Sequence, residues 1–294
     1  MRKLIVALSL GIIALGFVSC RRDAITPAEV KEGLEQRTVV FTASGKDYSV
    51  KSTESGFGDG DIIGIFAPDM EKYNVKATVS GGKNLTPEVP VRWNKDQTRN
   101  SDFFAYFPYV EEVSASTYTF SVASDQTTDD AFKASDLRTA HVSAAPMSTV
   151  AFVLGHRFSK ITFAFIGLSG GEKITGVVIK DMLTQATIDI GTGGQASETG
   201  KADVSAHKKA DDSFEAVLIP QSYLKTEVTT SSGRTLKYTT FTPFELESGY
   251  AYEAALMIPA PNHDTDEIGF TFSIVDWDSG GAISYGEPTN TDSL

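Results

Sequence analysis

Short runs of apolar and β-branched residues recur from residue 38 onward, separated by clusters of Gly, Asp, Asn and Ser. The clearest run, Ile268–Ile274, has Ile or Phe at every second position and Gly, Thr or Ser between them, as in a strand with one buried face. Nearly all of the runs have the length of a strand. The predicted strands are Thr38–Ala43, Ile62–Phe66, Val75–Val79, Phe103–Phe107, Tyr118–Val122, Val150–Leu154, Lys160–Ile166, Ile174–Ile179, Ala186–Ile190, Phe214–Ile219, Tyr250–Met257 and Ile268–Ile274.

Helical patterning is nearly absent from the same part of the chain. Only Asp129–Leu137 also fits a helix, and the runs do not alternate with helices of ~10–15 residues, which argues against a parallel α/β sheet. The sequence therefore predicts an all-β fold. So many short strands suit two tandem antiparallel β-sandwich domains of ~100–130 residues each better than one closed barrel.

The boundary between the two sandwiches is placed near Leu154–Arg157, which gives domains at residues 38–155 and 156–294. The glycine-rich piece Gly191–Gly200 is a second candidate boundary, but a division there would leave under ~100 residues for the C-terminal domain. We interpret that piece as a long hairpin loop within the second domain.

The first 37 residues have a different character. Two basic residues precede an apolar run, Leu4–Val18, which is shorter than the ~20 residues needed to span a membrane and is followed by Ser19 and Cys20. Residues 1–19 are therefore predicted to be a cleaved export signal. Residues 20–37 are polar, with a short helix-like piece at Pro27–Glu35, and are predicted to form a tether.

Cys20 is the only cysteine of the chain. Its place directly after a small residue at the end of the signal resembles the lipobox of bacterial lipoproteins, in which the cysteine becomes the acylated first residue. The alternative is a secreted protein with one stray thiol. Acylation with several chains would anchor the protein to a membrane more firmly than a single chain does.

The composition excludes several classes of protein. A single cysteine excludes a disulfide-stapled miniprotein, and 25 Gly with 11 Pro are close to ordinary usage, which excludes collagen-like and low-complexity chains. The net charge of -12 over 294 residues argues against nucleic acid as a partner, because that binding depends on Lys and Arg neutralising phosphates.

One segment formally matches a catalytic motif. Gly167–Gly171 fits G-x-S-x-G, in which Ser169 would be a nucleophile on a turn between a strand and a helix. The residues that follow are strand-like, so the glycines are better explained as a hairpin turn. The four histidines have no triad-like or metal-ligand spacing: we interpret His156 as a satisfied edge or core group and His141, His207 and His263 as loop residues.

Two acidic segments and one aromatic run could suggest a metal site or a sugar-binding site, but a structural role explains each of them better. Gly58–Asp61 and Asn262–Asp266 carry acidic oxygens that Ca²⁺ could use, but neither has the spacing of an EF-hand loop, and turn chemistry explains them better. The aromatic run Phe103–Tyr109 could stack on sugars, but alternation places at least one pair of its rings toward a core. We expect no catalytic residue, no metal and no cofactor.

Several segments together resemble the fimbrillin-like (Mfa-like) family of Bacteroidales lipoproteins, which are fimbrial subunits and their relatives. The resemblance covers nearly the whole chain and depends on the order and spacing of its pieces. They are Cys20, Phe57–Ala67 (FGDGDIIGIFA), Asp102–Tyr109 (DFFAYFPY), Phe152–Ile161 (FVLGHRFSKI), Leu218–Gln221 (LIPQ) and the strand that ends at Trp277.

The resemblance implies two transthyretin-like β-sandwich domains in a lipoprotein of the outer membrane. In family members that polymerise, a protease cuts after an arginine and removes an N-terminal strand, and a strand of the next subunit fills the apolar groove. By position Arg37 is the candidate cut site, because it precedes the first predicted strand. The tail after Trp277 offers only Ala282, Ile283 and Tyr285 as pocket fillers, so a tip, accessory, anchor or non-polymerising member stays open.

The leading hypothesis is a lipid-anchored fimbrial subunit or adhesin of the cell surface that assembles by strand exchange, without catalysis. Its partners would be other fimbrial subunits, the outer membrane, and a host or bacterial receptor or glycan. The alternative is a glycan-binding surface lipoprotein that does not polymerise and uses Trp93, Trp277 or Tyr109 to stack on sugars. Retention in the periplasm also stays open, because Arg21 and Arg22 are not the acidic stretch associated with surface export.

Overall fold

The computed structural model describes residues 37–45, 56–94, 96, 98–113, 117–192, 194–260, 270–277 and 282–283. Cys20, the export signal and most of the predicted tether lie outside these residues, as do His263 and the segment Asn262–Asp266. Within the described residues, no helix is long and apolar enough to cross a membrane.

The described chain is almost entirely β-structure, which confirms the all-β prediction. Its strands are β1 (Phe41–Gly45), β2 (Ile62–Ala67), β3 (Lys72–Ser80), β4 (Asn84–Pro87), β5 (Ser101–Phe107), β6 (Thr117–Ser121), β7 (Arg138–Ala144), β8 (Val150–His156), β9 (Ser159–Ile166), β10 (Ile174–Asp189), β11 (Gln195–Ser205), β12 (His207–Lys208), β13 (Phe214–Leu218), β14 (Ser222–Thr230), β15 (Thr235–Glu245), β16 (Tyr250–Met257), β17 (Phe270–Asp276) and β18 (Ala282–Ile283). The helices are the 3₁₀ turn η1 (Pro68–Met70) and α2 (Asp129–Ser135).

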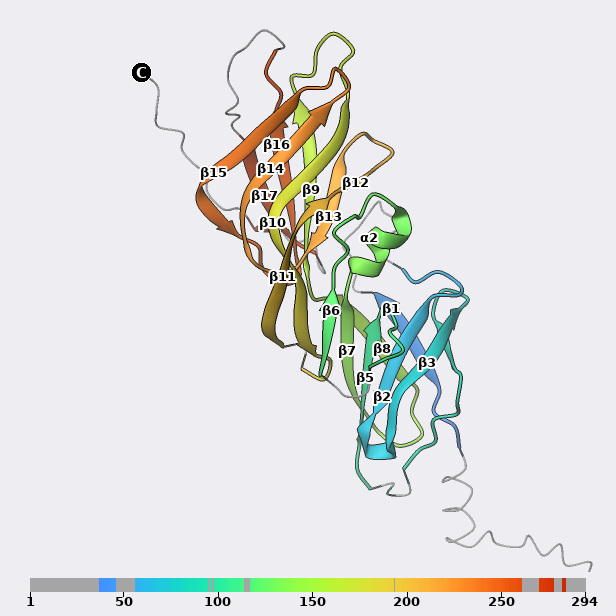
Figure 1. Ribbon diagram of the computed structural model, residues 1–294. Helices are drawn as coiled ribbons and strands as arrows, with labels where there is room; N and C mark the ends of the chain where they lie inside the picture. The colour runs from blue at the N-terminus through green and yellow to red at the C-terminus, as the bar shows by residue number, and fades with distance from the viewer. Residues whose placement is uncertain are drawn as a thin grey trace, which may run out of the picture.

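The first seven-stranded sheet closes on itself in the order β1-β4-β3-β2-β5-β7-β8, with β8 and β1 paired in parallel. The other strands form two open sheets. One has the order β11-β10-β14-β15, with β6 also paired to β10, and the other has the order β12-β13-β9-β16-β17-β18. Figure 1 shows the closed sheet at one end of an elongated molecule and the two open sheets at the other, with α2 between them.

Separate hydrophobic clusters fill these layers. One lies inside the closed sheet, and a second lies between the two open sheets, where the residues include Phe163, Tyr223 and Tyr252. Two smaller clusters lie at the junction. We call the one that contains Phe120, Val217 and Trp277 the junction cluster.

β6 lies within the range predicted for the first domain, and it pairs with β10 of an open sheet. The second small cluster joins Tyr106, on the outside of the closed sheet, to Ile190 at the end of β10. The two ends of the molecule are therefore packed against each other through β6, β10 and the segments around them. The boundary near Leu154–Arg157 stays a prediction.

Two sequence interpretations are corrected by the long strand β10. Ile174–Ile179 and Ala186–Ile190 were predicted as separate strands, but one strand, interrupted by a bulge between Ile179 and Met182, covers both. Gly191–Gly200 is not a long hairpin loop, because β11 already begins at Gln195 and pairs with β10. Only the few residues between the two strands form the turn.

The helix predicted at Asp129–Leu137 is confirmed as α2. Thr128 caps it, because its hydroxyl accepts a hydrogen bond from the backbone N–H of Ala131 at 3.3 Å. Two aspartates in its first turn further favour the start of a helix, since they complement its dipole.

Two glutamine side chains complete the open sheets where a neighbouring strand is missing. Leu183 of β10 donates to Oε1 of Gln221 at 2.6 Å, and Nε2 of Gln221 donates to the carbonyl of Leu183 at 3.1 Å. Gln126 pairs in the same way with Val217 of β13, at 2.9 and 2.8 Å. Each amide satisfies one N–H and one C=O group, as an adjacent strand would.

Candidate functional site

The first strand, β1, closes the seven-stranded sheet by lying between β4 and β8. It is antiparallel to β4, with Phe41 opposite Leu85, and parallel to β8, from Phe41 opposite Val150 to Gly45 opposite Leu154. The pairing with β8 joins parts of the chain about a hundred residues apart.

Main-chain hydrogen bonds hold the β1 segment along both of its edges. On one side, Val39 donates to the carbonyl of Val91 and Ala43 to that of Lys83, both at 2.8 Å. On the other side, Val150 donates to the carbonyl of Val40 at 2.9 Å. The segment is therefore an internal strand of the sheet, and its removal would leave unpaired backbone groups on two neighbours.

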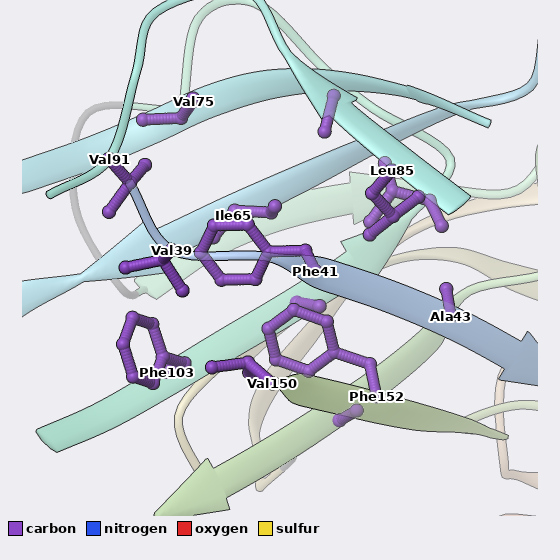
Figure 2. Packing of buried hydrophobic residues seen from close by; sticks show 14 of the residues in the cluster. Val39, Phe41, Ala43, Ile65, Val75, Leu85, Val91, Phe103, Val150 and Phe152 are labelled. Atoms are coloured by element: carbon purple, nitrogen blue, oxygen red, sulfur yellow. The ribbon is translucent and has the colours of Figure 1, made fainter. Parts of the chain in front are cut away.

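Alternate side chains of the segment complete the core of the closed sheet. Val39, Phe41 and Ala43 are each at most 2% exposed, whereas Val40 between them is 60% exposed. The ring of Phe41 packs edge-on to Phe103, with centroids 5.5 Å apart, and is stacked with Phe152 at 5.9 Å. Figure 2 shows these side chains pointing toward one another from three strands.

An empty β1 position would be an apolar groove with hydrogen-bonding edges. Its floor would be formed by Phe103, Val150 and Phe152, which are all buried in the present arrangement. An extended segment with apolar side chains at every second position would fit, because main-chain bonds would supply the pairing and the side chains would fill the pockets. The geometry therefore suits the exchange of one strand for another.

Arg37, the candidate cut site, is exposed where the chain enters this strand. Its carbonyl accepts a hydrogen bond from the backbone N–H of Trp93 at 3.2 Å. A cut after Arg37 would leave β1 on the C-terminal product with a free N-terminal end. Whether this bond is cut stays a prediction, as does the acylation of Cys20, which lies outside the described residues.

A buried ionic cluster lies at the junction end of β7 and β8. Asp136 accepts a hydrogen bond from Nε of Arg138 at 2.8 Å and pairs with Nδ1 of His156 at 2.7 Å, and the ring of His156 is stacked on Trp277 at 3.7 Å. Burial opposes ionisation of Asp136, but the Arg138 guanidinium and the His156 ring outweigh it and lower the pKa of that carboxyl to about 2. The cluster joins β7 and β8 of the closed sheet to the end of β17.

The structure gives no support to a nucleophilic Ser169. This serine is exposed in the connection between β9 and β10, which belong to different open sheets, so the segment is not the predicted hairpin turn. The described histidines are engaged elsewhere: His141 with Asp102, His156 with Asp136, and His207 with Asp129.

The interpretation of His156 as a satisfied buried group is correct, since it is 6% exposed and paired with Asp136. The interpretation of His141 and His207 as loop residues is wrong, because His141 lies in β7 and His207 in β12. In β7, the exposed His141 lies between buried Ala140 and half-buried Val142, and it is stacked on Phe104 at 4.4 Å.

The acidic segment Gly58–Asp61 forms a turn, as predicted. Oδ2 of Asp61 accepts from the backbone N–H of Gly58 at 2.8 Å, and Oδ1 of Asp59 accepts from the N–H of Gly82 at 2.9 Å. Gly60 has a φ of 92°, which favours glycine. Among the described residues, no group of three or more His, Cys, Asp or Glu could hold a metal ion.

The aromatic run in β5 is buried on both faces. Phe103 and Phe107 point into the closed sheet, while Tyr106 on the other face packs in the cluster with Ile190. Gly64 of β2 leaves room for this ring, because a Cβ atom there would lie 1.9 Å from Cε1 of Tyr106.

The stacking residues proposed for a glycan site are mostly inaccessible. Trp93 is 4% exposed and Trp277 is 8% exposed, so neither presents a ring to solvent. Tyr109 is partly exposed, and it packs against the cluster of Tyr106 and Ile190. Two of the three rings required by the glycan hypothesis are therefore buried and cannot stack on a sugar.

Three comparisons with known proteins bear on this geometry. A family model described as fimbrillin-like matches residues 36–277. No curated protein matches the chain in sequence. Among solved structures, a candidate cell adhesion protein of Bacteroides ovatus is 18% identical, with a TM-score of 0.67 over 82% of this chain and 98% of the other.

A second candidate cell adhesion protein, from Bacteroides uniformis, is 21% identical, with a TM-score of 0.65 over 82% of this chain and 98% of the other. At such identities the likeness shows a shared fold. In both cases it covers nearly the whole of the solved chain, so the closed sheet and the open sheets occur together in these proteins.

Proposed function

The chain belongs to the fimbrillin-like family, and from this premise we propose that it is a lipid-anchored subunit of a fimbrium, or an adhesin, that assembles at the cell surface by exchanging β1. Membership of this family supports a structural role rather than catalysis, and it supports other fimbrial subunits as partners.

The observation that carries the proposal is the position of β1. Val39, Phe41 and Ala43 complete the core with their inward side chains, yet β1 is the first strand of the sheet and begins four residues after Arg37. Once the chain is cut there, β1 would be joined to the rest only through residues 46–55 and could leave the sheet as a free-ended strand. The apolar groove would then favour capture of a strand from a neighbour.

The proposal of a lipid anchor depends on the sequence of the N-terminus. Acylated Cys20 would be followed by a tether of 17 residues, 21–37, before β1. Such a tether would hold the closed sheet close to the outer membrane, with the open sheets farther away, until a cut after Arg37 releases the rest of the chain from the anchor. Mass spectrometry of the native N-terminus separates the two predicted forms, acylated Cys20 and a new terminus at Thr38.

The strand exchange is tested with a labelled peptide of residues 278–294 added to protein cut after Arg37. We expect saturable binding, measured by fluorescence anisotropy, together with oligomers of the cut protein. Arg37→Ala is the matched control, because it should remain uncut and bind nothing. No binding and no oligomers after complete cleavage would exclude assembly by this route.

A further inference from the structure

The outer face of the open sheet that contains β9 and β16 changes in polarity along the strands. Near the junction, Val217 and Ala251, the register partners of Lys160, pack in the junction cluster. Farther along, Thr162 and Glu253 are paired and are partly or fully exposed, as expected for a solvated face.

At the far end of the same face, the outward residues become apolar again. Ala164 is paired with Ala255, and Ile166 with Met257, so all four side chains project from one side of the sheet. Ile166 is 54% exposed and Met257 is 59% exposed. We call these four residues the distal strip.

The strip differs from the scattered apolar residues of an ordinary surface. Their inward neighbours Phe163 and Leu256 pack in the core between the open sheets, so the outward side chains of the strip take no part in that core. Leu168, two residues after Ile166 in the connection to β10, is also exposed, at 39%. A contiguous apolar face of this kind marks a contact surface.

The C-terminal tail indicates which partner reaches the strip. β18 is antiparallel to β17, with Ile283 opposite Ile274, so the chain leaves β18 toward the distal end of the sheet. An extended chain rises about 3.3 Å per residue, so the residues after β18 can reach past the distal end of the sheet. If Ala282 and Ile283 stay in β18 while Tyr285 and the residues after it enter the closed sheet of another copy, they would hold that sheet beside the distal strip.

The closed sheet carries a matching apolar position next to the exchanged strand. Val153 of β8 is 49% exposed on the outer face, where it lies opposite Ser44 of β1. Ala151, also exposed, lies on the same face of β8. Both residues would remain in place when β1 is exchanged.

We propose that the distal strip is the surface on which the outer face of β8 of the next copy docks, in a head-to-tail contact. This inference rests on the proposed strand exchange and adds to it a second contact between the same two copies. Such a contact is heterologous, so it leads to an open filament rather than a closed dimer. Residues 261–269 of the same chain are a poorer cover, because Ile268 is their only large aliphatic residue.

The contact is tested by cysteine cross-linking in the full mature chain carrying Cys20→Ser. Copies with Met257→Cys are mixed with copies with Val153→Cys, cut after Arg37 and treated with a mild oxidant. We expect cross-links between the two kinds of copy at about tenfold or more the yield obtained with Thr162→Cys, which lies on the same face nearer the junction.

Three results would overturn the contact. Polymers that form and bind the 278–294 peptide without these cross-links would remove the contact and leave strand exchange intact. Cross-links between two Met257→Cys copies would indicate a symmetric dimer. Protection of the introduced thiol from a soluble reagent in uncut monomers would show that the chain covers its own strip.

A substitution that keeps the strip exposed but makes it polar gives a second measurement. Ile166→Lys with Met257→Lys should raise the concentration needed for polymerisation roughly tenfold or more, while Thr162→Lys leaves it unchanged. Peptide binding should be unaffected in both variants. Loss of peptide binding and of all polymers in the unsubstituted cut protein would overturn the proposed function and the contact together.

Discussion

The closed sheet and the open sheets solve the problem of strand edges in opposite ways. Each of the seven strands in the closed sheet has two strand neighbours, and the parallel pairing of β1 with β8 completes the ring. The open sheets end at edge strands, and side-chain amides of Gln126 and Gln221 complete hydrogen bonding where a strand is missing. Closing the sheet removes its unpaired edges, but the core then depends on every strand of the ring. In the open sheets, a glutamine amide replaces the hydrogen bonds of only one residue of a missing strand.

This difference supports the closed sheet as the proposed site of assembly. A groove that needs several successive backbone bonds and three apolar side chains can be filled only by another strand. In the open sheets, the gaps beside Leu183 and Val217 are already filled from within the chain.

The largest effect is expected at the ring that β1 contributes to the closed sheet. Phe41→Ala removes a ring that is 1% exposed and contacts Phe103 and Phe152, so it should lower the free energy of unfolding by ~3–5 kcal/mol. Val40→Ala, at the exposed neighbouring position, should change it by no more than ~0.5 kcal/mol. Urea denaturation measures both, and equal effects would show that β1 does not complete the core.

The second prediction concerns the buried ionic cluster that joins the two regions. Asp136→Asn removes the charge that Asp136 supplies to the buried Arg138 guanidinium and should cost about 3 kcal/mol. The matched control is Asp102→Asn, because the Asp102–His141 pair has both side chains 48% exposed and should cost less than ~1 kcal/mol.

The same cluster predicts how stability depends on pH. The pKa of Asp136 is lowered to about 2 in the folded protein, below its value near 3.9 in an unfolded chain. Its contribution to stability, roughly 2–3 kcal/mol, is thus complete above about pH 5 and is lost as the pH falls through the folded-state pKa near 2. Thermal unfolding between pH 2 and 5 should show a shallower acid dependence in Asp136→Asn than in the unsubstituted protein, and identical slopes would contradict the assignment.

The third prediction compares the two glutamines of the open sheets. Gln126 is fully buried, so Gln126→Ala leaves the N–H and C=O of Val217 without partners in the core and should cost about 2–3 kcal/mol. Gln221 is only partly buried, and Gln221→Ala should cost about 1–2 kcal/mol, because water can reach the freed groups of Leu183.

Hydrogen exchange gives the local measurement for this pair. The Val217 amide should exchange faster in Gln126→Ala, and the Leu183 amide in Gln221→Ala, each without a change at the other. Unchanged protection of both amides would mean that other groups replace the glutamines.

Sequence patterns identified the strands whose apolar residues are numerous, such as Phe103–Phe107 and Val150–Leu154. They missed β14 and β15, in which Thr, Lys and Ser outnumber the apolar residues, although Tyr223 and Tyr238 are buried. Burial there comes from the facing open sheet, and local sequence carries little sign of it.

The candidate site was only partly predictable for a similar reason. The alternation in Thr38–Ala43 indicated a strand, and Arg37 was noted by its position before it. The neighbours of that strand were not predictable, because β1 pairs with residues 83–91 and 150–154, far along the chain. Pairing of this kind depends on the whole topology, which a run of a few residues does not encode.

The smallest effect is expected for the ion pair that links α2 to the closed sheet. Nζ of Lys133 lies 2.6 Å from Oδ1 of Asp61, but the lysine side chain is 52% exposed, so solvent screens the pair. Lys133→Ala should therefore cost under ~1 kcal/mol. A double-mutant cycle with Asp61→Asn, which can still accept from Gly58, isolates the pair, and its coupling should weaken as salt is raised. A coupling above ~2 kcal/mol would mean that α2 is held to the closed sheet by charge, whereas a small one assigns that role to the apolar packing and the buried cluster of Asp136.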